Sequence, residues 1–311
     1  MGLFRVSLNP SVRVCRALCE IWSACEGICA SERATRWWIG AGPTFFENQP
    51  LLHSPAGLRH PFFNGDESSL TNKKRGDVIV VIGTEWKTLL HATQDLAAAL
   101  AGQGHQLVGA DVGSDCGTER GHIGFLDGTS NLQELSPERF NESVFVQNVD
   151  DPLFAGGTYL VLRKYEENVE MWEDLPEPVQ EQMIGRRKTS GAFLSHEIEW
   201  SPSVWDQTLP NAHIRLAHLR LEAQNWQDRF YRRSVKFTER SEDGIRCGLL
   251  FIALCRSPQE QVVRIHNSRL LPEQGPQDLL LSSGYVKPLF SGTYFLPRVI
   301  NQLSGMANAE E

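Results

Sequence analysis

The chain has 311 residues, with 30 Lys and Arg against 38 Asp and Glu, so its formal net charge is −8. Its 41% hydrophobic and 22% charged residues are typical of a globular protein of about two domains. An acidic chain gains little from the phosphate backbone of nucleic acid, so nucleic acid is not expected as its main partner. No apolar run approaches the ~20 residues that a membrane-spanning helix needs, so no membrane is expected either.

The cysteine count and the first thirty residues bear on the compartment. Seven cysteines, an odd number in a long chain, argue against a disulfide framework and favour a reducing environment. Charged residues such as Arg5, Arg13 and Glu20 interrupt the first thirty residues, which is not the pattern of a secretory signal. We therefore expect a cytoplasmic protein.

The first 112 residues alternate between short extended patterns and longer helical ones. Strands are predicted over residues 3–9, 36–42, 77–83 and 105–112. Helices are predicted after the first strand, through about Ala30, and after the third, from a cap at Thr84 to about Gly102. A polar, proline-rich loop is expected over residues 43–76. The order β-α-β-β-α-β is the ferredoxin-like pattern.

The second half is predicted to repeat this order. Strands are expected over residues 156–165, 247–255 and 289–297, an extended segment over 212–218, and helices from Pro176 to about Arg186 and from Cys255 to about Leu271. The fold class is therefore α+β, with two ferredoxin-like domains, residues 1–120 and 121–311, that form a β-sheet core with peripheral helices. The turn-rich segment 113–151 joins the halves and is the first place to look for a site.

Four cysteines, Cys15, Cys19, Cys25 and Cys29, lie close together near the N-terminus. Their spacing, Cys-x3-Cys-x5-Cys-x3-Cys, differs from the Cys-x2-Cys pairs of structural zinc sites. Because the stretch is predicted to be helical, we interpret these thiols as small buried hydrophobic side chains rather than metal ligands.

Asp127 lies in the segment GHIGFLDGTSN, residues 121–131. One interpretation is an Asp-Gly turn whose carboxylate caps backbone amides, and the spacing alone favours it. The other is a carboxylate fixed at the mouth of an apolar cavity, where it transfers protons.

Two histidines and two arginines follow later in the chain. His213 and His218 are five residues apart, so on an extended segment they would face opposite sides and would not bind one metal ion together. A single imidazole suffices for haem, whose iron already has four ring nitrogens. Arg232 and Arg233 lie in a basic and aromatic stretch that is typical of a solvated strand edge, and either one would be costly to bury without an anion.

The order and spacing of these motifs resemble the dye-decolorising peroxidases, a family of haem enzymes. GFLDG, at residues 124–128, matches the G-x-x-D-G signature, and Thr129 and Asn131 continue the family's DGTxN run. AHIRLAH resembles the proximal-histidine segment and FYRRS the distal-arginine segment. GGTYLVLRKY, IGRRK, GLLFIA and FSGTYFLP are also similar to family segments, so the resemblance covers nearly the whole chain, from about Leu3 to Val299.

The resemblance implies one haem b in the C-terminal half and a role for each residue of its site. His213 would be the axial ligand of the iron, and Asp127 and Arg232 the catalytic acid and arginine of the opposite, distal face. Arg232 keeps the family's spacing, whereas Arg233 would point the other way on a strand. Leu249 and Phe251 would line the distal pocket.

Two further roles stay open in the sequence. Arg186 or Arg187, in IGRRK, would pair with the haem propionates, and we name Arg186 as the candidate. A hydrogen bond to His213 would make its imidazole electron-rich, and Asp278 is our hypothesis for that partner.

The resemblance implies a peroxidase that reduces hydrogen peroxide and oxidises bulky organic reductants, dye-like or phenolic, by one-electron steps. Two alternatives stay open: a haem-handling protein that releases iron from haem, as a deferrochelatase does, and a non-enzymatic haem carrier. A carrier has no need of a buried acid beside an arginine, so Asp127 and Arg232 argue against it. The resemblance also implies a homo-oligomer, which the residues alone do not establish.

Overall fold

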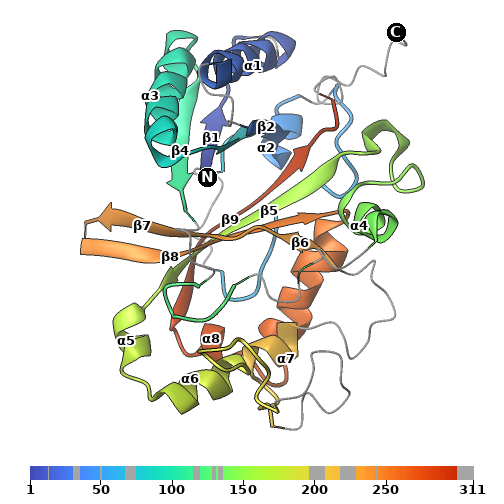
Figure 1. The fold of residues 1–311 in the computed structure, drawn as a ribbon. Coiled ribbons are helices and arrows are strands. Elements are labelled where there is room, and N and C mark those ends of the chain that lie inside the picture. The colour runs from blue at the N-terminus through green and yellow to red at the C-terminus, as the bar shows by residue number, and fades with distance from the viewer. Residues whose placement is uncertain are drawn as a thin grey trace.

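The computed structural model describes residues 1–12, 14–30, 36–49, 51–66, 75–114, 120–127, 131, 136–195, 207–217, 229–242 and 244–299. Figure 1 shows a sheet through the middle of the molecule, with two long helices above it and a group of short helices below. Each half of the chain contributes one unit with the predicted ferredoxin-like order of strands and helices.

The N-terminal half contains four strands, β1 (Gly2–Ser7), β2 (Arg36–Ala41), β3 (Val78–Gly83) and β4 (Gln106–Val112). They pair antiparallel in the order β4-β1-β3-β2, which is the order that the β-α-β-β-α-β pattern produces. The helices α1 (Val14–Ala30) and α3 (Trp86–Gly102) contact each other and cover one face of these strands (Figure 1). The four predicted strands are therefore confirmed to within one or two residues.

Three details of this half differ from the predictions. A short helix, α2 (Pro43–Glu47), begins the segment predicted to be a loop, because Pro43 is tolerated in a first turn. The residue at the N-cap of α3 is Glu85, with extended backbone, so the predicted cap at Thr84 is wrong. The thiol of Cys25 is buried as predicted, but Cys19 is exposed, because it lies on the outer face of α1 while Leu18 and Ile21 face the core. The side chains of Cys15 and Cys29 lie outside the described residues.

The C-terminal half contains the strands β5 (Thr158–Glu167), β6 (Tyr231–Arg232), β7 (Val235–Ser241), β8 (Gly244–Cys255) and β9 (Val286–Leu296). Their order, β9-β5-β8-β6 with β7 also paired to β8, repeats that of the first half. One pair, Ala41 with Phe295, joins β2 to β9, so the two halves share one nine-stranded sheet within the described residues. The α+β fold class with two ferredoxin-like units is confirmed.

The helices of this half are short: α4 (Pro137–Val144), η3 (Pro152–Phe154), α5 (Val169–Glu173), α6 (Glu177–Ile184), α7 (His213–Ala217), η7 (Pro258–Val263), η8 (His266–Leu270) and α8 (Leu279–Ser282). The prediction that residues 212–218 are extended is wrong, since His213 to Ala217 form α7. The Leu216 amide donates to the Ala212 carbonyl at 3.2 Å within this helix, and the Leu279 amide of α8 donates to the Asn211 carbonyl at 3.2 Å, so a distant segment contacts the chain just before α7. His218 lies outside the described residues.

Side chains alternate between the two faces of the central strands. On one face Leu162 of β5 and Leu250 of β8 are buried in a cluster with Leu3 and Ile79 of the N-terminal half. On the other face Arg163, Tyr165, Leu249 and Phe251 point toward the helices α6 to α8. Val161, on the same face as Arg163, packs in a core cluster with Phe4 of the N-terminal half, so both faces join the halves. Room for a site is left on this second face at the end of β5 that carries Arg163 and Tyr165.

Candidate functional site

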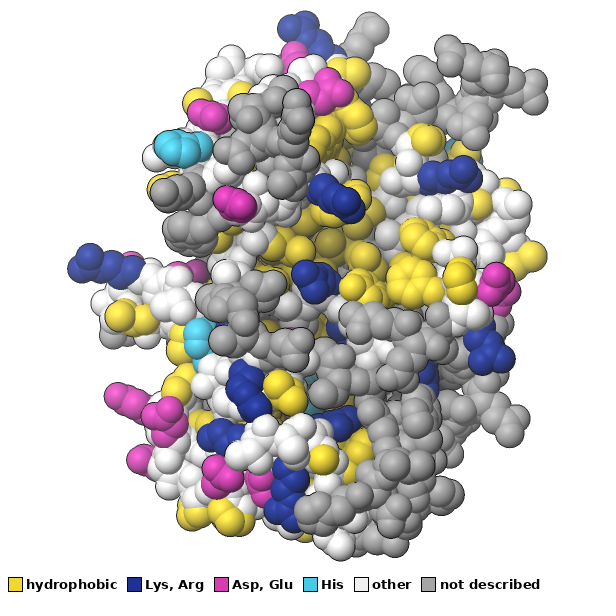
Figure 2. Space-filling model, in the orientation of Figure 1, with side chains coloured by type: hydrophobic (Ala, Val, Ile, Leu, Met, Phe, Trp, Pro, Cys, Tyr) yellow, Lys and Arg dark blue, Asp and Glu magenta, His cyan; other side chains and the backbone are white. Residues whose placement is uncertain are grey.

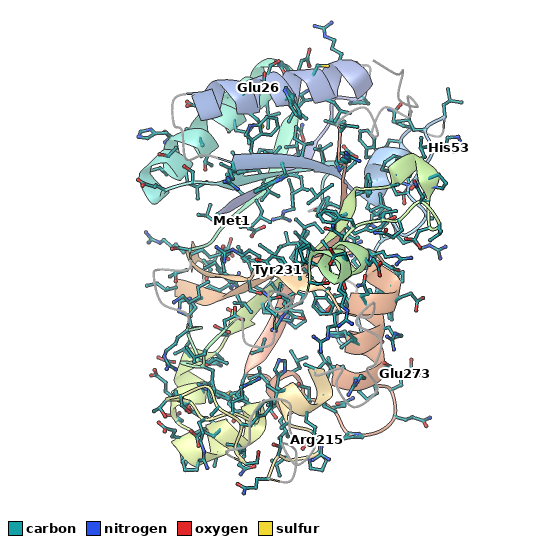
Figure 3. All side chains as sticks on the ribbon, turned by 45° about the vertical axis from the view of Figure 1, so that its right-hand side comes forward. Met1, Glu26, His53, Arg215, Tyr231 and Glu273 are labelled. Carbon is teal, nitrogen blue, oxygen red and sulfur yellow. The ribbon has the colours of Figure 1, made fainter. Side chains whose placement is uncertain are left out.

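A cavity of about 310 Å³ lies between this second face and the short helices below it. Its wall is mostly apolar and includes Ile184, Ile214, Leu249, Phe251, Val262 and Leu280. Its size is within the range of cavities that hold small ligands and cofactors. In Figure 3, Tyr231 of β6 lies at the level of the sheet and Arg215 of α7 lies at the bottom, so strand and helix form different walls.

Every site residue predicted from the sequence lines this one cavity: Asp127, Arg186, His213, Arg232, Leu249 and Phe251. They come from the loop after Arg120, the segment after α6, the start of α7, the edge strand β6 and the central strand β8. Residues more than 100 positions apart are therefore brought together by the fold. Their individual roles stay predictions.

His213 is the first residue of α7, and its ring is held by Asp278. Nδ1 of His213 lies 2.7 Å from Oδ2 of Asp278, whose carboxylate accepts, so Nδ1 carries the hydrogen. The other oxygen of Asp278 accepts from the Leu281 amide at 3.0 Å as the N-cap of α8, which fixes the carboxylate in place. The hypothesis that Asp278 is the partner of His213 is confirmed.

This arrangement sets the protonation of the imidazole. Burial lowers the pKa of His213, but the charge of Asp278 and its hydrogen bond together outweigh burial, so the pKa lies above the ordinary value. When the ring is neutral, the hydrogen stays on Nδ1 and Nε2 keeps a lone pair. Such a nitrogen is the usual form of a metal-binding histidine whose orientation is fixed by a carboxylate.

The loop that carries Asp127 is held from outside by a neighbouring arginine. Arg120 donates to the carbonyls of Gly124 at 2.9 Å, Lys188 at 2.5 Å and Thr189 at 2.6 Å, so it ties this loop to the segment after α6. Gly124 has a φ of +85°, and a Cβ there would lie 2.6 Å from Cε of Lys188. Asp127 itself is exposed at the cavity wall, which fits the interpretation of a carboxylate at a cavity mouth. The expectation that this acid is buried is therefore wrong.

Arg232 is fixed to the same stretch of chain by Asn131. Nδ2 of Asn131 donates to the Arg232 carbonyl at 2.8 Å, and the Arg232 amide donates back to Oδ1 at 3.1 Å. Burial lowers the pKa of Arg232, and the negative charge of Asp127 raises it in part. A carboxylate and a guanidinium therefore face the same cavity within electrostatic reach of each other.

The remaining predicted residues, Leu249, Phe251 and Arg186, lie in the apolar and cationic parts of the cavity wall. Leu249 and Phe251 alternate along β8, opposite Tyr165 and Arg163 of β5. Of the two arginines that the sequence left open, Arg186 is buried, stacks 4.2 Å from the ring of Phe193 and lines the cavity. Arg187 instead pairs with Glu181 at 2.8 Å and is not part of the wall.

The donor set excludes one kind of metal site and fits another. No group of three His, Cys, Asp or Glu side chains lies close enough to hold a bare ion within the part of the chain that the structure describes. A lone imidazole in an apolar cavity suits a metal that brings most of its own ligands with it.

Comparison with known proteins agrees with this chemistry. The family model "Dyp-type peroxidase, C-terminal" matches residues 118–301, more than half of the chain. The chain belongs to the Dyp-type peroxidase family. The match begins just before the loop that carries Asp127 and runs past β9, so it includes every residue named above as lining the cavity.

Two curated relatives show how far the family resemblance reaches. The chain is 30% identical to a dye-decolorizing peroxidase of Thermobifida fusca over 222 residues, which are 64% of this chain and 50% of that protein. It is 32% identical to a deferrochelatase of Yersinia pestis over 189 residues, 57% of this chain and 41% of that protein. The chain thus spans half or less of the length of these relatives.

Solved structures share the fold of this Dyp-type chain. Ferric DtpA from Streptomyces lividans superimposes with a TM-score of 0.78 at 22% identity, over 95% of this chain and 88% of that one. A DypB variant from Rhodococcus jostii in complex with heme superimposes with a TM-score of 0.75 at 19% identity, over 95% and 92%. At these identities the likeness concerns the fold alone.

Among the residues of the cavity region that sequence reasoning missed, Arg120 and Glu167 are the two to which we assign a role in the site. Arg120 was not singled out, because its three acceptors are backbone carbonyls that carry no sequence signal. Glu167 lines the wall beside Tyr165 and is buried, yet the run of residues 163–167 reads as an ordinary strand end. Only the alternation of side chains between the two faces of β5 indicates that Glu167 belongs to the cavity wall, because it places Glu167 on the face of Arg163 and Tyr165.

Proposed function

We propose that this chain binds one haem b in the cavity and reduces hydrogen peroxide, with bulky organic molecules as one-electron donors. The carrying observation is that one oriented imidazole, one carboxylate–guanidinium couple and an apolar wall converge on a single cavity. A relative is named a dye-decolorizing peroxidase, and a protein of the same fold is a heme complex, which supports the proposal.

The residues present fit a haem. Nε2 of His213 would bind the iron, and the apolar side chains of Ile184, Ile214 and Leu280 would contact the porphyrin. Arg186 would offer its charge to a propionate, since it is the arginine of its pair that reaches the cavity. When bound, the haem supplies a redox-active iron that takes up electrons one at a time.

The chain's own residues would move the protons. The carboxylate of Asp127 accepts a proton from one oxygen of hydrogen peroxide and returns it to the other, which becomes water. Arg232 stabilises negative charge as it develops on oxygen. Asp278 keeps the hydrogen of His213 on Nδ1, so that Nε2 stays available.

Replacement of the acid and the arginine tests the catalytic assignment. D127A and R232A should each slow the reaction with hydrogen peroxide by about 100-fold or more, with haem still bound, because general acid–base and electrostatic groups contribute on this scale. Absorption spectra before peroxide report haem retention, and stopped-flow spectra after mixing report the reaction. R233A is the matched control, since Arg233 is exposed. If both variants react as fast as the parent, these assignments are wrong.

A second candidate function is the release of iron from haem, as in a relative named deferrochelatase that is 32% identical over 189 residues. Incubation of the protein with hemin and a reductant would then produce metal-free porphyrin, which fluoresces. We expect no porphyrin fluorescence above that of the H213A variant.

We also propose that the protein is a homo-oligomer and that it is located in the cytoplasm. We further propose that the chain consists of two domains, residues 1–120 and 121–311. The described cysteines Cys19, Cys25, Cys247 and Cys255 are all free thiols, as a reducing compartment favours, and none of the described helices is long and apolar enough to cross a membrane. Hydrophobic side chains gather in a hollow at the level of β5 and β9 (Figure 2), a surface of the kind that protein contacts cover. Light scattering of the purified protein measures the mass.

A further inference from the structure

The strand β5 ends at the cavity with three side chains on one face, Arg163, Tyr165 and Glu167. Arg163 has an ion-pair partner, Asp66. Among the described residues, Glu167 has no ion-pair partner. It is only 7% exposed, and its Oε2 is buried without a hydrogen-bond partner in the described part of the chain.

Charged and titratable groups face Glu167 from three elements: Asp127 in its loop, Lys236 on β7 and Cys247 on β8, whose thiol donates to the Glu167 carbonyl at 3.9 Å. Burial, and after it the charge of Asp127, raise the pKa of Glu167 to about 7, while Lys236 lowers it. The preceding residue, Glu166, belongs to the other face of the strand and pairs with Arg246 at 2.9 Å. Thus Glu166 is paired with a cation, whereas the neighbouring Glu167 is buried at the cavity without an ion-pair partner among the described residues.

This environment favours a neutral acid. A carboxylate that stays ionised in a protein interior is normally paired with a cation or accepts several hydrogen bonds. Among the described residues, one oxygen of Glu167 is buried with neither, and the negative charge of Asp127, which lines the same cavity, acts on it. A carboxyl group that holds its proton near neutral pH beside a proton-transferring carboxylate is arranged to exchange protons with it.

We propose that Glu167 is a positioning acid of this site that acts through Asp127: it holds a proton in the buried part of the cavity wall and passes it to that carboxylate, which itself reaches the solvent. The inference rests on the proposed function. Reduction of one hydrogen peroxide to two waters consumes two protons and two electrons. The organic donors supply the electrons, and Asp127 only moves a proton from one oxygen to the other. Two protons must therefore enter from outside. Solvent delivers them to the exposed Asp127, and the buried Glu167 carboxyl holds one of them and returns it to Asp127 when that carboxylate has given up its own.

The first test compares E167Q with E166Q across the neutral pH range. The amide keeps the shape of the side chain but neither releases nor accepts a proton. In the haem-loaded parent, turnover of peroxide and dye should fall as pH rises through about 7, because the protonated form of Glu167 is lost. E167Q should turn over about 10-fold more slowly below that pH and should lose this inflection, whereas E166Q should follow the parent. An E167Q profile that superimposes on the parent's overturns the proposal.

A second readout needs no turnover. Infrared spectra of the same proteins should show a protonated-carboxyl band that disappears as pH rises through neutrality and that E167Q lacks. D127N should move this titration to lower pH, because the charge of Asp127 is one cause of the raised pKa. A band that is unchanged in D127N overturns the coupling. If the protein fails to bind haem, the proposed function is wrong, yet the infrared titration still reports on Glu167.

Discussion

At the scale of single residues, Asp278 carries two tasks that can be separated. One carboxylate oxygen caps α8 and the other accepts from His213. D278N should keep the cap, since an amide oxygen also accepts, but its NH2 group would donate to Nδ1 and move the imidazole hydrogen to Nε2. We therefore expect D278N to fold normally and to bind hemin more weakly than the parent. D278A should also lose about 1 kcal/mol of unfolding free energy with the cap.

Hemin titration and urea unfolding of both variants check this prediction. Equal hemin affinity of D278N and the parent would contradict the role given to the Asp278–His213 pair.

Glu167 also predicts how stability depends on pH. Its folded pKa of about 7 lies above the ordinary 4.5, so its protonation stabilises the folded state below about pH 4.5, and this contribution is lost as pH rises through 7. Between pH 4.5 and pH 7 the parent should lose about 3 kcal/mol of unfolding free energy relative to E167Q, whose amide does not titrate. Urea unfolding at a series of pH values measures it, and a constant difference would mean that Glu167 titrates as an exposed glutamate does.

At the scale of elements, most strands were predictable, and so were α6 and the helical segments η7 and η8, whereas β7 and α7 were not. The apolar runs of β3 and β8 and the alternation of β5 are local signals, which a sequence carries in full. The start of the five-residue helix α7 is held by a hydrogen bond between His213 and Asp278, which is 65 residues later, a contact that no local pattern shows. The Leu and Ile residues of α7 were therefore mistaken for an extended pattern. The site residues were recognised through family motifs, whereas Arg120 and Glu167 act through contacts that no motif records.

The pairing of Asn131 with Arg232 is an element-scale contact that can be tested. N131A removes the two reciprocal hydrogen bonds between the acid's loop and β6, at 2.8 and 3.1 Å. The haem should remain bound, but the peroxide reaction should slow by about 10-fold or more, since small displacements of catalytic groups are costly. Stopped-flow absorption measures the rate, and N131A at the parent's rate would show that this pairing does not position Arg232.

At the scale of the whole molecule, one buried ion network connects the halves of the sheet. Asp111 of β4 pairs with Arg5 of β1 at 2.7 Å and with Lys164 of β5 at 2.9 Å. D111L leaves two buried cations without this partner and should lower the unfolding free energy by about 3–5 kcal/mol. D150A, which breaks a half-exposed pair with Arg256, should cost about 0–1 kcal/mol.

The triple variant R5M/D111L/K164M separates the pairing from simple burial. Replacement of a whole buried ion group by apolar side chains is often neutral, so this variant should recover most of the loss in D111L. Urea unfolding measures all three proteins. A triple variant as unstable as D111L would indicate that packing, and not the unpaired charge, causes the loss.

The central claim is that a single imidazole, that of His213, anchors one haem in the cavity. Hemin titration followed by absorption spectroscopy tests it on three proteins: the parent, H213A and H53A, whose altered residue is exposed and lies far from α7 (Figure 3). The parent and H53A should each bind one equivalent with the spectrum of a histidine-ligated haem, and H213A should bind weakly or with a different spectrum. A parent that takes up no hemin, or an H213A variant with the parent's affinity and spectrum, would contradict the account.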